Sequence, residues 1–493
     1  MEARTRRPLA GAGFVAAAAA FVLTLGAGAE GAQGPRASLA DAAKQQDWAA
    51  VPALLRAGAD VDRPHGDGTT ALHWAVYWDD APTVRRLLAA GAAVDAANDL
   101  GATPLWLAAS NGSAALLETL LAAGADPDQP LPSGETPLMT ASRTGDPAAV
   151  QALLDRGADP HATERTFGQT ALMWAVAQQH AEVVRVLLAS GARVDDRSRA
   201  YPQVVSSSGN ADPSGVFEVL LGGYTPLLFA ARHGDVASAR LLVAAGAAVD
   251  EAAASGTTPL VVAAHGNHRE LATFLLETGA DPNAAGAGYS ALHAAVLRGD
   301  AQLVATLLRF GADPDAVLER GTPARRVSAD WRLPHGMIGA TPFWVAASFR
   351  EPAIMRLLAA HGADPSASLG GETAAMAAIL GGSTRGRFGV PRPAADVEQR
   401  RAVDAVDAAL DAGVDVNARG ARGETALHLA VSRRLDEAVA LLAERGAELD
   451  ARNERGETPL DLALAAGDAA GSTARLLREL GATAPDGEPV AAR

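Results

Sequence analysis

The chain has 493 residues, of which 48% are hydrophobic, 20% charged and 4% aromatic, and this composition favours small, closely packed helices over a β-sandwich. Its net charge of -15, with no long basic run, disfavours nucleic acids and anionic membrane surfaces as partners, because phosphate groups would repel the chain. The sequence contains no cysteine, which excludes a disulfide framework, a thiolate metal site and a cysteine nucleophile.

Residues 1–29 have the pattern of an export signal. Arg4, Arg6 and Arg7 form a positive segment, an uncharged stretch follows, and residues 27–29 (Ala-Gly-Ala) match a small-x-small cleavage site. Cleavage there predicts a periplasmic or secreted protein of bacterial type, with no membrane segment in the mature chain. The alternative is an uncleaved anchor, because the uncharged stretch 8–29 is long enough to span a bilayer, although its glycines and other small residues favour cleavage.

Residues 30–66 are expected to form a linker and an N-terminal capping half-repeat. Ser38 followed by Asp41 is a helix start of the Ser-x-x-acid type. Lys44, Gln46 and Asp47 make this opening unit polar, as an end repeat must be where its outer face meets water.

A Thr/Ser-Pro/Ala-Leu element recurs through the rest of the chain, usually about 33 residues apart and with three longer gaps. The first residues of its copies are Thr70, Thr103, Thr136, Thr170, Thr225, Thr258, Ser290, Thr341, Thr373, Thr425 and Thr458. Self-similarity of this period predicts a solenoid of stacked units over residues 67–482, none of which can bury its apolar face alone.

Each copy opens a helical hairpin of nearly fixed length. The threonine is a good N-cap, and a proline at the next position has its φ already set for a first helical turn. A short apolar stretch such as 105–109 is broken by Gly112, and a second helix with the spacing of 183–188 ends in a Leu-Leu pair and a glycine. The pattern predicts rigid two-helix units joined by turns that tolerate insertion.

The motifs at the two ends of this unit resemble those of a known family. Gly68–His73 and Gly423–His428 are similar to the ankyrin G-x-T-P-L-H signature, and Gly279–Asn283 is similar to its G-A-D-V-N ending. The resemblance covers residues 38–482. It implies an all-α ankyrin-repeat solenoid of about eleven helix-turn-helix repeats, with short β-hairpin fingers and a partial N-terminal capping repeat.

The family's histidine is retained at His73, His293 and His428, where its expected role is a hydrogen bond that closes a Thr–His turn. The other copies are expected to lose local hydrogen bonds without loss of the fold. They carry Trp106, Met139, Met173, Leu228, Val261, Trp344, Met376 and Asp461 at this position.

Three insertions interrupt the regular spacing, near residues 197–222, 315–338 and 382–400. The first two fall in projecting turns, and residues 216–220 of the first are compatible with a short strand. The insertions are either tolerated surface loops or, through residues such as Tyr201 and Trp331, part of a binding rim. Residues 483–493 are expected to form a disordered tail.

Ankyrin proteins usually contact their partners through the finger tips and the exposed face of the first helix of each pair, which here lies seven and eight residues after each threonine. Aromatic and arginine side chains at such positions favour a partner with apolar anchors and carboxylates. The alternatives are packing against a neighbouring repeat for Tyr77 and Trp78, and ordinary solvation for the arginines. The candidate partner-binding residues are Tyr77, Trp78, Asn111, Arg143, Gln178, Arg232, His233, His265, Arg298, Phe349 and Arg433.

No catalytic, cofactor-binding or metal-binding residues are expected. His265 and His268 are three residues apart but lack a nearby carboxylate pair, and residues 206–208 are serines without a nucleophile elbow. The sequence has no G-x-G-x-x-G motif or P-loop.

The sequence therefore predicts a monomeric, non-enzymatic scaffold that binds another protein through its concave face and finger tips. One alternative is an inhibitor, immunity or accessory factor for an exported enzyme. Another is a ligand-binding protein or enzyme that uses the groove lined by the insertions. The fold by itself does not identify the partner.

Overall fold

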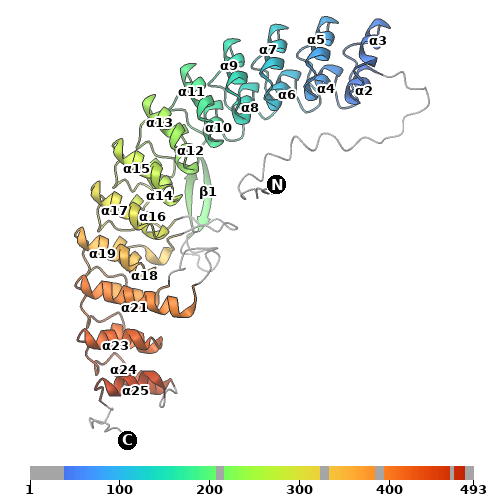
Figure 1. Ribbon diagram of the computed structural model, residues 1–493. Coiled ribbons are helices and arrows are strands. Elements are labelled where there is room, and N and C mark those ends of the chain that lie inside the picture. Colours follow the sequence, from blue (N-terminus) through green and yellow to red (C-terminus); the bar gives the residue numbers. More distant parts are fainter. Residues whose placement is uncertain (1–37, 207–215, 323–331, 383–392, 467–470, 484–493) are drawn as a thin grey trace, which may run out of the picture.

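A computed structural model describes residues 38–206, 216–322, 332–382, 393–466 and 471–483. These residues form helix pairs stacked in one row that curves into an arc (Figure 1). The first helix of each pair lies on the concave side of the arc and the second on the convex side (Figure 1). The expected export signal and the C-terminal tail lie outside the described residues.

Twelve such pairs are described, first helix before second in each. They are α2 (Leu39–Lys44) and α3 (Ala50–Arg56), α4 (Ala71–Tyr77) and α5 (Ala81–Ala89), α6 (Pro104–Asn111) and α7 (Ala114–Ala122), α8 (Pro137–Thr144) and α9 (Pro147–Asp155), α10 (Ala171–Ala177) and α11 (Ala181–Ala189), α12 (Pro226–His233) and α13 (Val236–Ala244), α14 (Pro259–His265) and α15 (Arg269–Glu277), α16 (Ala291–Arg298) and α17 (Ala301–Arg309), α18 (Pro342–Ser348) and α19 (Pro352–Ala360), α20 (Ala374–Leu380) and α21 (Ala395–Asp411), α22 (Ala426–Ser432) and α23 (Asp436–Glu444), and α24 (Pro459–Ala465) and α25 (Ser472–Glu479).

The helix ends follow the signals in the sequence. Thr103 caps α6 by accepting a hydrogen bond from the Trp106 amide at 3.1 Å, and Pro104 occupies the first turn. Gly112 ends the same helix in the left-handed conformation, with φ of 68°, which a side chain would strain. The helical hairpin expected from the sequence is therefore confirmed.

The core is one continuous row of small aliphatic side chains shared between neighbouring pairs. In α11, Val183, Val184 and Leu187 are fully buried, and alanines such as Ala175 and Ala230 let the first helices approach closely. Each pair buries its apolar stripe against the pair before and the pair after it, so the array is stabilised by its interfaces.

The turns between regular pairs are simpler than the expected β-hairpin fingers. They close through pairs of backbone hydrogen bonds, such as the Asn98 amide to the Ala102 carbonyl at 3.1 Å and the Gly101 amide to the Asn98 carbonyl at 2.8 Å. Among the regular units described, the strand-like pairing is limited to an isolated bridge between Leu369 and Glu372. Side chains join successive turns instead: the Asp95 carboxylate accepts from the Asp126 amide at 3.0 Å, and Asp250 accepts from Asp281 in the same way. These aspartates therefore connect neighbouring repeats.

The opening unit is more complete than the half-repeat expected. It has both helices, α2 and α3, and α2 begins with a reciprocal capping box. The Ser38 hydroxyl accepts from the Asp41 amide at 3.0 Å, and the Asp41 carboxylate accepts from the Ser38 amide at 3.2 Å.

The first insertion forms a β-hairpin on the concave side of the arc (Figure 1). Strand β1 (Tyr201–Ser206) pairs antiparallel with β2 (Val216–Leu221), and Tyr201 lies opposite Leu221. The short strand considered for residues 216–220 is therefore present, with a partner strand that the sequence analysis did not anticipate.

The other two insertions are partly built into the array. In the second, Leu333 and Met337 are fully buried, the latter in the short 3-10 helix η3 (His335–Met337), while Trp331 lies outside the described residues. In the third, residues 395–400 are not a loop but the first turns of α21, which has 17 residues where most second helices have nine. Within the described ranges, no helix is both long and apolar enough to cross a membrane.

Candidate partner-binding surface

The eleven candidate residues all lie at the C-terminal ends of the first helices. The turns lie at the opposite, N-terminal ends of the same helices, about 10 Å away for a helix of seven residues. The concave face therefore has two edges, one formed by the turns and one by the helix ends.

An aromatic cluster stands out on the helix-end edge. The side chains of Tyr77 and Trp78 remain 37% and 41% exposed, and their rings meet edge to face with centroids 4.9 Å apart. The Tyr77 ring also meets the buried ring of Trp74 at 5.8 Å, and the Lys44 ammonium lies 5.3 Å from the Trp74 ring centre. The two exposed rings are thus held in place by a buried one, which lowers the entropy cost of binding through them.

Two other candidates have structural partners. The Asn111 side-chain amide donates to the Val76 carbonyl at 2.8 Å, and Arg298 donates to the His265 carbonyl at 2.5 Å. Both carbonyls belong to the end of the preceding first helix, where no intrahelical donor is available. These side chains connect neighbouring repeats.

Arg143 is held in place as well. Its guanidinium lies 3.2 Å from the Glu135 carboxylate and 5.1 Å from the Trp174 ring centre. Both contacts neutralise or cover the charge, so Arg143 is less available to a partner carboxylate than a freely solvated arginine would be.

Two histidines that the sequence analysis did not identify also connect neighbouring repeats through a hydrogen bond to a backbone carbonyl. His180 Nε2 lies 3.1 Å from the Arg143 carbonyl oxygen, and His268 Nε2 lies 3.2 Å from that of Arg232. A signal was present, because both histidines stand ten residues after the threonine that opens their repeat, at Thr170 and Thr258.

The expectation that Phe349 is exposed is wrong. Its side chain is fully buried, as is that of Ser348, because the next pair covers this helix end. Adjacent Arg350 is also buried and forms a 2.8 Å ion pair with Glu398 in the added turns of α21. The third insertion therefore buries this part of the candidate surface in the core.

Of the remaining candidates, four have exposed side chains and one is half-buried. Gln178, Arg232, His233 and Arg433 are exposed at their helix ends, and His265 is half-buried with its ring 6.4 Å from that of Tyr289. Loss of water around the ring, the positive charge of Arg232 and the electrostatic interaction with His268 lower the pKa of His233, so a neutral His233 is expected near neutral pH.

The three retained histidines are confirmed as helix-capping residues. Nδ1 of His73 and of His428 accepts from the amide of its own threonine, at 3.2 and 3.1 Å. In both residues Nε2 reaches a carbonyl of the next repeat, that of Ala102 at 2.9 Å for His73. This arrangement requires a neutral ring that donates through Nε2, and burial accordingly lowers the pKa of both residues.

Asp461 replaces the family's histidine without the expected loss of local hydrogen bonds. The Asp461 carboxylate accepts from the Thr458 amide at 2.9 Å and its own amide donates to the Thr458 hydroxyl at 3.2 Å. An aspartate at this position therefore restores the capping box, because its carboxylate replaces the accepting ring nitrogen.

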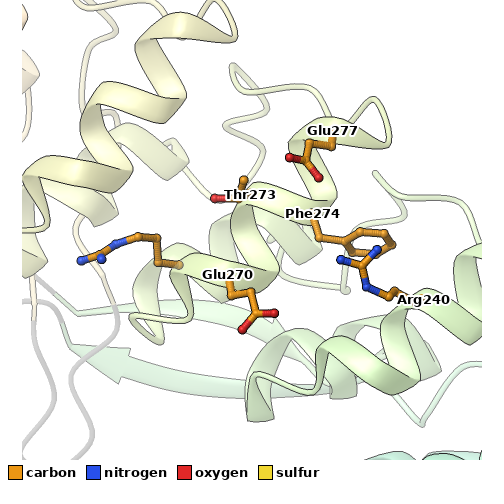
Figure 2. A pocket seen from close by; sticks show the side chains of 6 residues that line it. Arg240, Glu270, Thr273, Phe274 and Glu277 are labelled. Atoms are coloured by element: carbon orange, nitrogen blue, oxygen red, sulfur yellow. The ribbon is translucent and has the colours of Figure 1, made fainter.

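A shallow hollow of about 430 Å³ lies on the convex side, between α13 and α15 (Figure 2). The Arg240 guanidinium covers the Phe274 ring with 4.6 Å between centres, and Glu270 and Glu277 lie along the same helix as Phe274 (Figure 2). Arg269 at its rim is paired with Asp300 at 2.8 Å. Arg269 is held by Asp300 and Arg240 lies over the Phe274 ring, so the two guanidinium groups do not converge on a common point, and the hollow does not have the arrangement of a catalytic site.

No group of three or more His, Asp or Glu side chains in the described part of the chain is placed to hold a metal ion. In particular, His268 faces the Arg232 carbonyl, and His265 lies beside Tyr289. The concave face carries exposed aromatic rings, amide groups and a few arginine side chains. Such a surface is suited to the recognition of another molecule.

These features define a solenoid of stacked helix pairs with a long inner surface for contacts. The family model for ankyrin repeats in three copies matches residues 39–130, 105–198, 207–286 and 227–317, and that for ankyrin repeats in many copies matches 409–463. The matches to the first cover more than half of the chain, and the chain belongs to the ankyrin-repeat family. Ankyrin repeats generally mediate protein–protein interactions.

A curated relative shares part of the array. The chain is 34% identical over 129 residues to the ankyrin repeat and KH domain-containing protein mask-1 of Caenorhabditis elegans. The match covers 23% of this chain and 5% of that protein, so the likeness concerns a few repeats only.

Proposed function

We propose that this protein is a non-enzymatic, monomeric scaffold that binds another protein through its concave face and the turns beside it. The observation that carries the proposal is the Tyr77–Trp78 pair, two exposed aromatic rings held in a fixed geometry at one edge of that face. Aromatic residues supported in this way are typical of the few positions that supply most binding energy.

The partner's chemistry follows from the exposed side chains. The aromatic pair requires an apolar group, and the exposed arginines Arg232 and Arg433 favour carboxylates, while Asn111, Arg143 and Arg298 mainly hold the array together. Phe349 takes no part because it is buried.

We also propose that the chain is exported and acts in the periplasm or outside the cell, in a bacterium. The support is the positive, apolar and small-residue pattern of residues 1–29. Mass spectrometry of the mature protein tests this, since cleavage removes residues 1–29 and retention leaves them in place.

Affinity capture from the native exported fraction, followed by mass spectrometry, identifies the partner. Tyr77→Ala/Trp78→Ala is expected to weaken binding of that partner about 30-fold, the effect of losing about 2 kcal/mol at a hot spot. Phe310→Ala is the matched control, because Phe310 is also 37% exposed but stands at the end of a second helix. Equal affinity of the double variant and the wild type would exclude the aromatic pair as the anchor.

The same capture experiment also distinguishes the proposed scaffold from the alternative function. A passive scaffold leaves the activity of its partner unchanged. A single exported enzyme as the partner, with an activity that changes on binding, would instead establish an inhibitor, immunity or accessory factor.

A further inference from the structure

The first two insertions contact each other on the concave side of the array, across three helix pairs. The β1–β2 hairpin lies in the chain between α11 and α12, and Arg320 lies in the second insertion, between α17 and α18. The Arg320 guanidinium lies 5.6 Å from the centre of the Phe217 ring in β2. Figure 1 shows the hairpin on the concave side, extending from the start of α12 in the direction of α18. The contact therefore links two segments that are not neighbours in the row of pairs.

The base of the hairpin is fixed to the turns on either side of it. The Arg199 amide donates to the Phe167 carbonyl at 2.6 Å, in the turn before α10. The Arg197 guanidinium donates to the Ala252 carbonyl at 2.9 Å, in the turn before α14. The hairpin therefore projects from a base that two neighbouring turns hold in place.

The backbone of Arg320 is fixed on its own side of the contact. Leu318 and Thr322 are buried, so the segment belongs to the core just before and just after Arg320. The Glu319 and Arg320 amides both donate to the Gly288 carbonyl, at 2.9 and 3.1 Å. Gly288 allows this close approach, because a Cβ at its position would lie 2.4 Å from the Arg320 Cβ. The guanidinium therefore extends from a backbone position that the turn before α16 holds.

The length of the hairpin suits this contact. Strand β2 has six residues and is about 20 Å long at about 3.3 Å per residue. The three intervening pairs, from α12 to α17, occupy about 24–30 Å at about 8–10 Å each. The long Arg320 side chain spans the difference. The hairpin face that carries Phe217 is turned toward the array, since Val219 on the same face is buried.

A contact of this range changes how a solenoid can bend. The helices of this array pack mainly against those of the adjacent pairs, so small rotations at successive interfaces add up along the row. A link across several interfaces on the concave side opposes that bending, because opening the arc would separate the two ends of the link. Contacts between adjacent pairs cannot supply this restraint.

From these observations we infer that the Phe217 ring and the Arg320 guanidinium form a clasp that fixes the curvature of the array between α11 and α19. A concave face held in one shape loses less entropy when any partner binds along it. The two insertions thus act as a matched pair. The inference goes beyond the proposed function, and its test requires no partner.

The test measures a distance across the clasp in the full chain. The sequence contains no cysteine, so two introduced cysteines carry the only spin labels. Ala189→Cys and Ala360→Cys place the labels at the exposed ends of α11 and α19, about 32–40 Å apart at about 8–10 Å per pair. Double electron–electron resonance gives the distance distribution. Ala89→Cys with Ala189→Cys is the reference, because both labels then lie on the N-terminal side of the clasp.

Two substitutions open the clasp from opposite sides. Phe217→Ser removes the ring and Arg320→Gln removes the charge. Each is expected to lower the ratio of closed to open conformations about two- to fivefold, the strength of an exposed cation–π contact. The distribution between positions 189 and 360 should broaden, and that between 89 and 189 should not change. The double variant should broaden it no further than either single variant, because both changes remove the same contact.

Two matched controls leave the clasp in place. Arg240→Gln removes another arginine–phenylalanine contact within the labelled span, but that contact joins the adjacent helices α13 and α15 (Figure 2). Val204→Ser changes the exposed face of the hairpin, opposite Phe217. Both controls are expected to leave the distribution unchanged. Circular dichroism and urea unfolding verify that every variant is folded.

Three results would overturn the inference. The first is an unchanged distribution in both clasp variants while the array stays folded. The second is equal broadening by Arg240→Gln, because any local contact would then have the same effect. The third is additive broadening in the double variant, which would mean that the two side chains act separately. Broadening confined to the clasp variants and equal in the double variant supports the clasp, whether or not a protein partner is captured.

Discussion

At the scale of single residues, the same few side chains cap a helix and connect two repeats. A histidine three residues after the capping threonine accepts from its own helix start and donates to the next repeat, as His73 and His428 do. Because the ring is buried and must stay neutral, this arrangement makes the stability of the array depend on pH.

His293 should show this most strongly, because burial lowers its pKa to about 4. In the unfolded chain its pKa is near 6.5, so between pH 6.5 and 4 the unfolded state binds more protons and stability falls as pH falls. The stabilisation is complete above pH 6.5, and about 3 kcal/mol of it is lost by pH 4 at about 1.4 kcal/mol per pKa unit. His293→Gln, which keeps the capping box, should flatten this part of the curve in urea unfolding at several pH values. Parallel curves for the two proteins would contradict the prediction.

A second residue-scale prediction concerns buried Arg350. Its guanidinium donates to the Ala378 and Ile379 carbonyls at 2.9 and 3.0 Å and pairs with Glu398 at 2.8 Å, and burial lowers its pKa. Arg350→Met leaves these acceptors without their donor and should lower the free energy of unfolding by about 3 kcal/mol.

The control for this prediction is Arg356→Met. Arg356 is about half exposed and lies 3.8 Å from Asp407, so its loss should cost less than about 1 kcal/mol. Urea titration of both variants compares the two costs, and similar values would show that Arg350 contributes no more than a surface ion pair.

At the scale of elements, the three insertions differ in how far they are built into the array. The hairpin of β1 and β2 has its own register and one exposed face, whereas Met337 of η3 is fully buried and α21 covers the end of α18. Insertion into a surface turn costs little, but a buried insertion becomes part of the core.

This difference can be measured on two variants. Replacing residues 201–221 by two glycines should change the free energy of unfolding by less than about 1 kcal/mol, because the helix pairs on either side, α10–α11 and α12–α13, pack directly against each other. Met337→Ala should cost about 2–5 kcal/mol, since it empties a buried site. Thermal and urea unfolding give both values, and a large loss on removing the hairpin would mean that it supports the neighbouring pairs.

At the scale of the whole molecule, stability is a sum over interfaces between neighbouring pairs. The helices of a pair contact those of the adjacent pairs along the row, so a weak central pair should uncouple the two halves of the array.

Leu292→Ala tests this, because Leu292 is fully buried in α16, near the middle of the row. The substitution should cost about 2–5 kcal/mol locally and split urea unfolding into two steps. Tryptophan fluorescence reports mainly on the N-terminal half, which holds Trp48, Trp74, Trp78, Trp106 and Trp174, and circular dichroism reports on both halves. A single coincident transition by the two probes would show that the row unfolds as one unit.

The repeat by itself determined the architecture. Thr-Pro starts, apolar spacing and closing glycines act within a few residues, so they identified the helix pairs and the histidine caps, and the exposed Tyr77–Trp78 pair was found by its position in the repeat. What only the tertiary structure decided depends on contacts across an insertion: Phe349 is buried because α21 is extended, His180 and His268 reach carbonyls of other repeats, and residues 201–206 have a partner strand. The physical reason is that burial and hydrogen bonding depend on which segments lie in contact in the folded protein. An insertion changes those contacts without changing the local sequence pattern of the repeat.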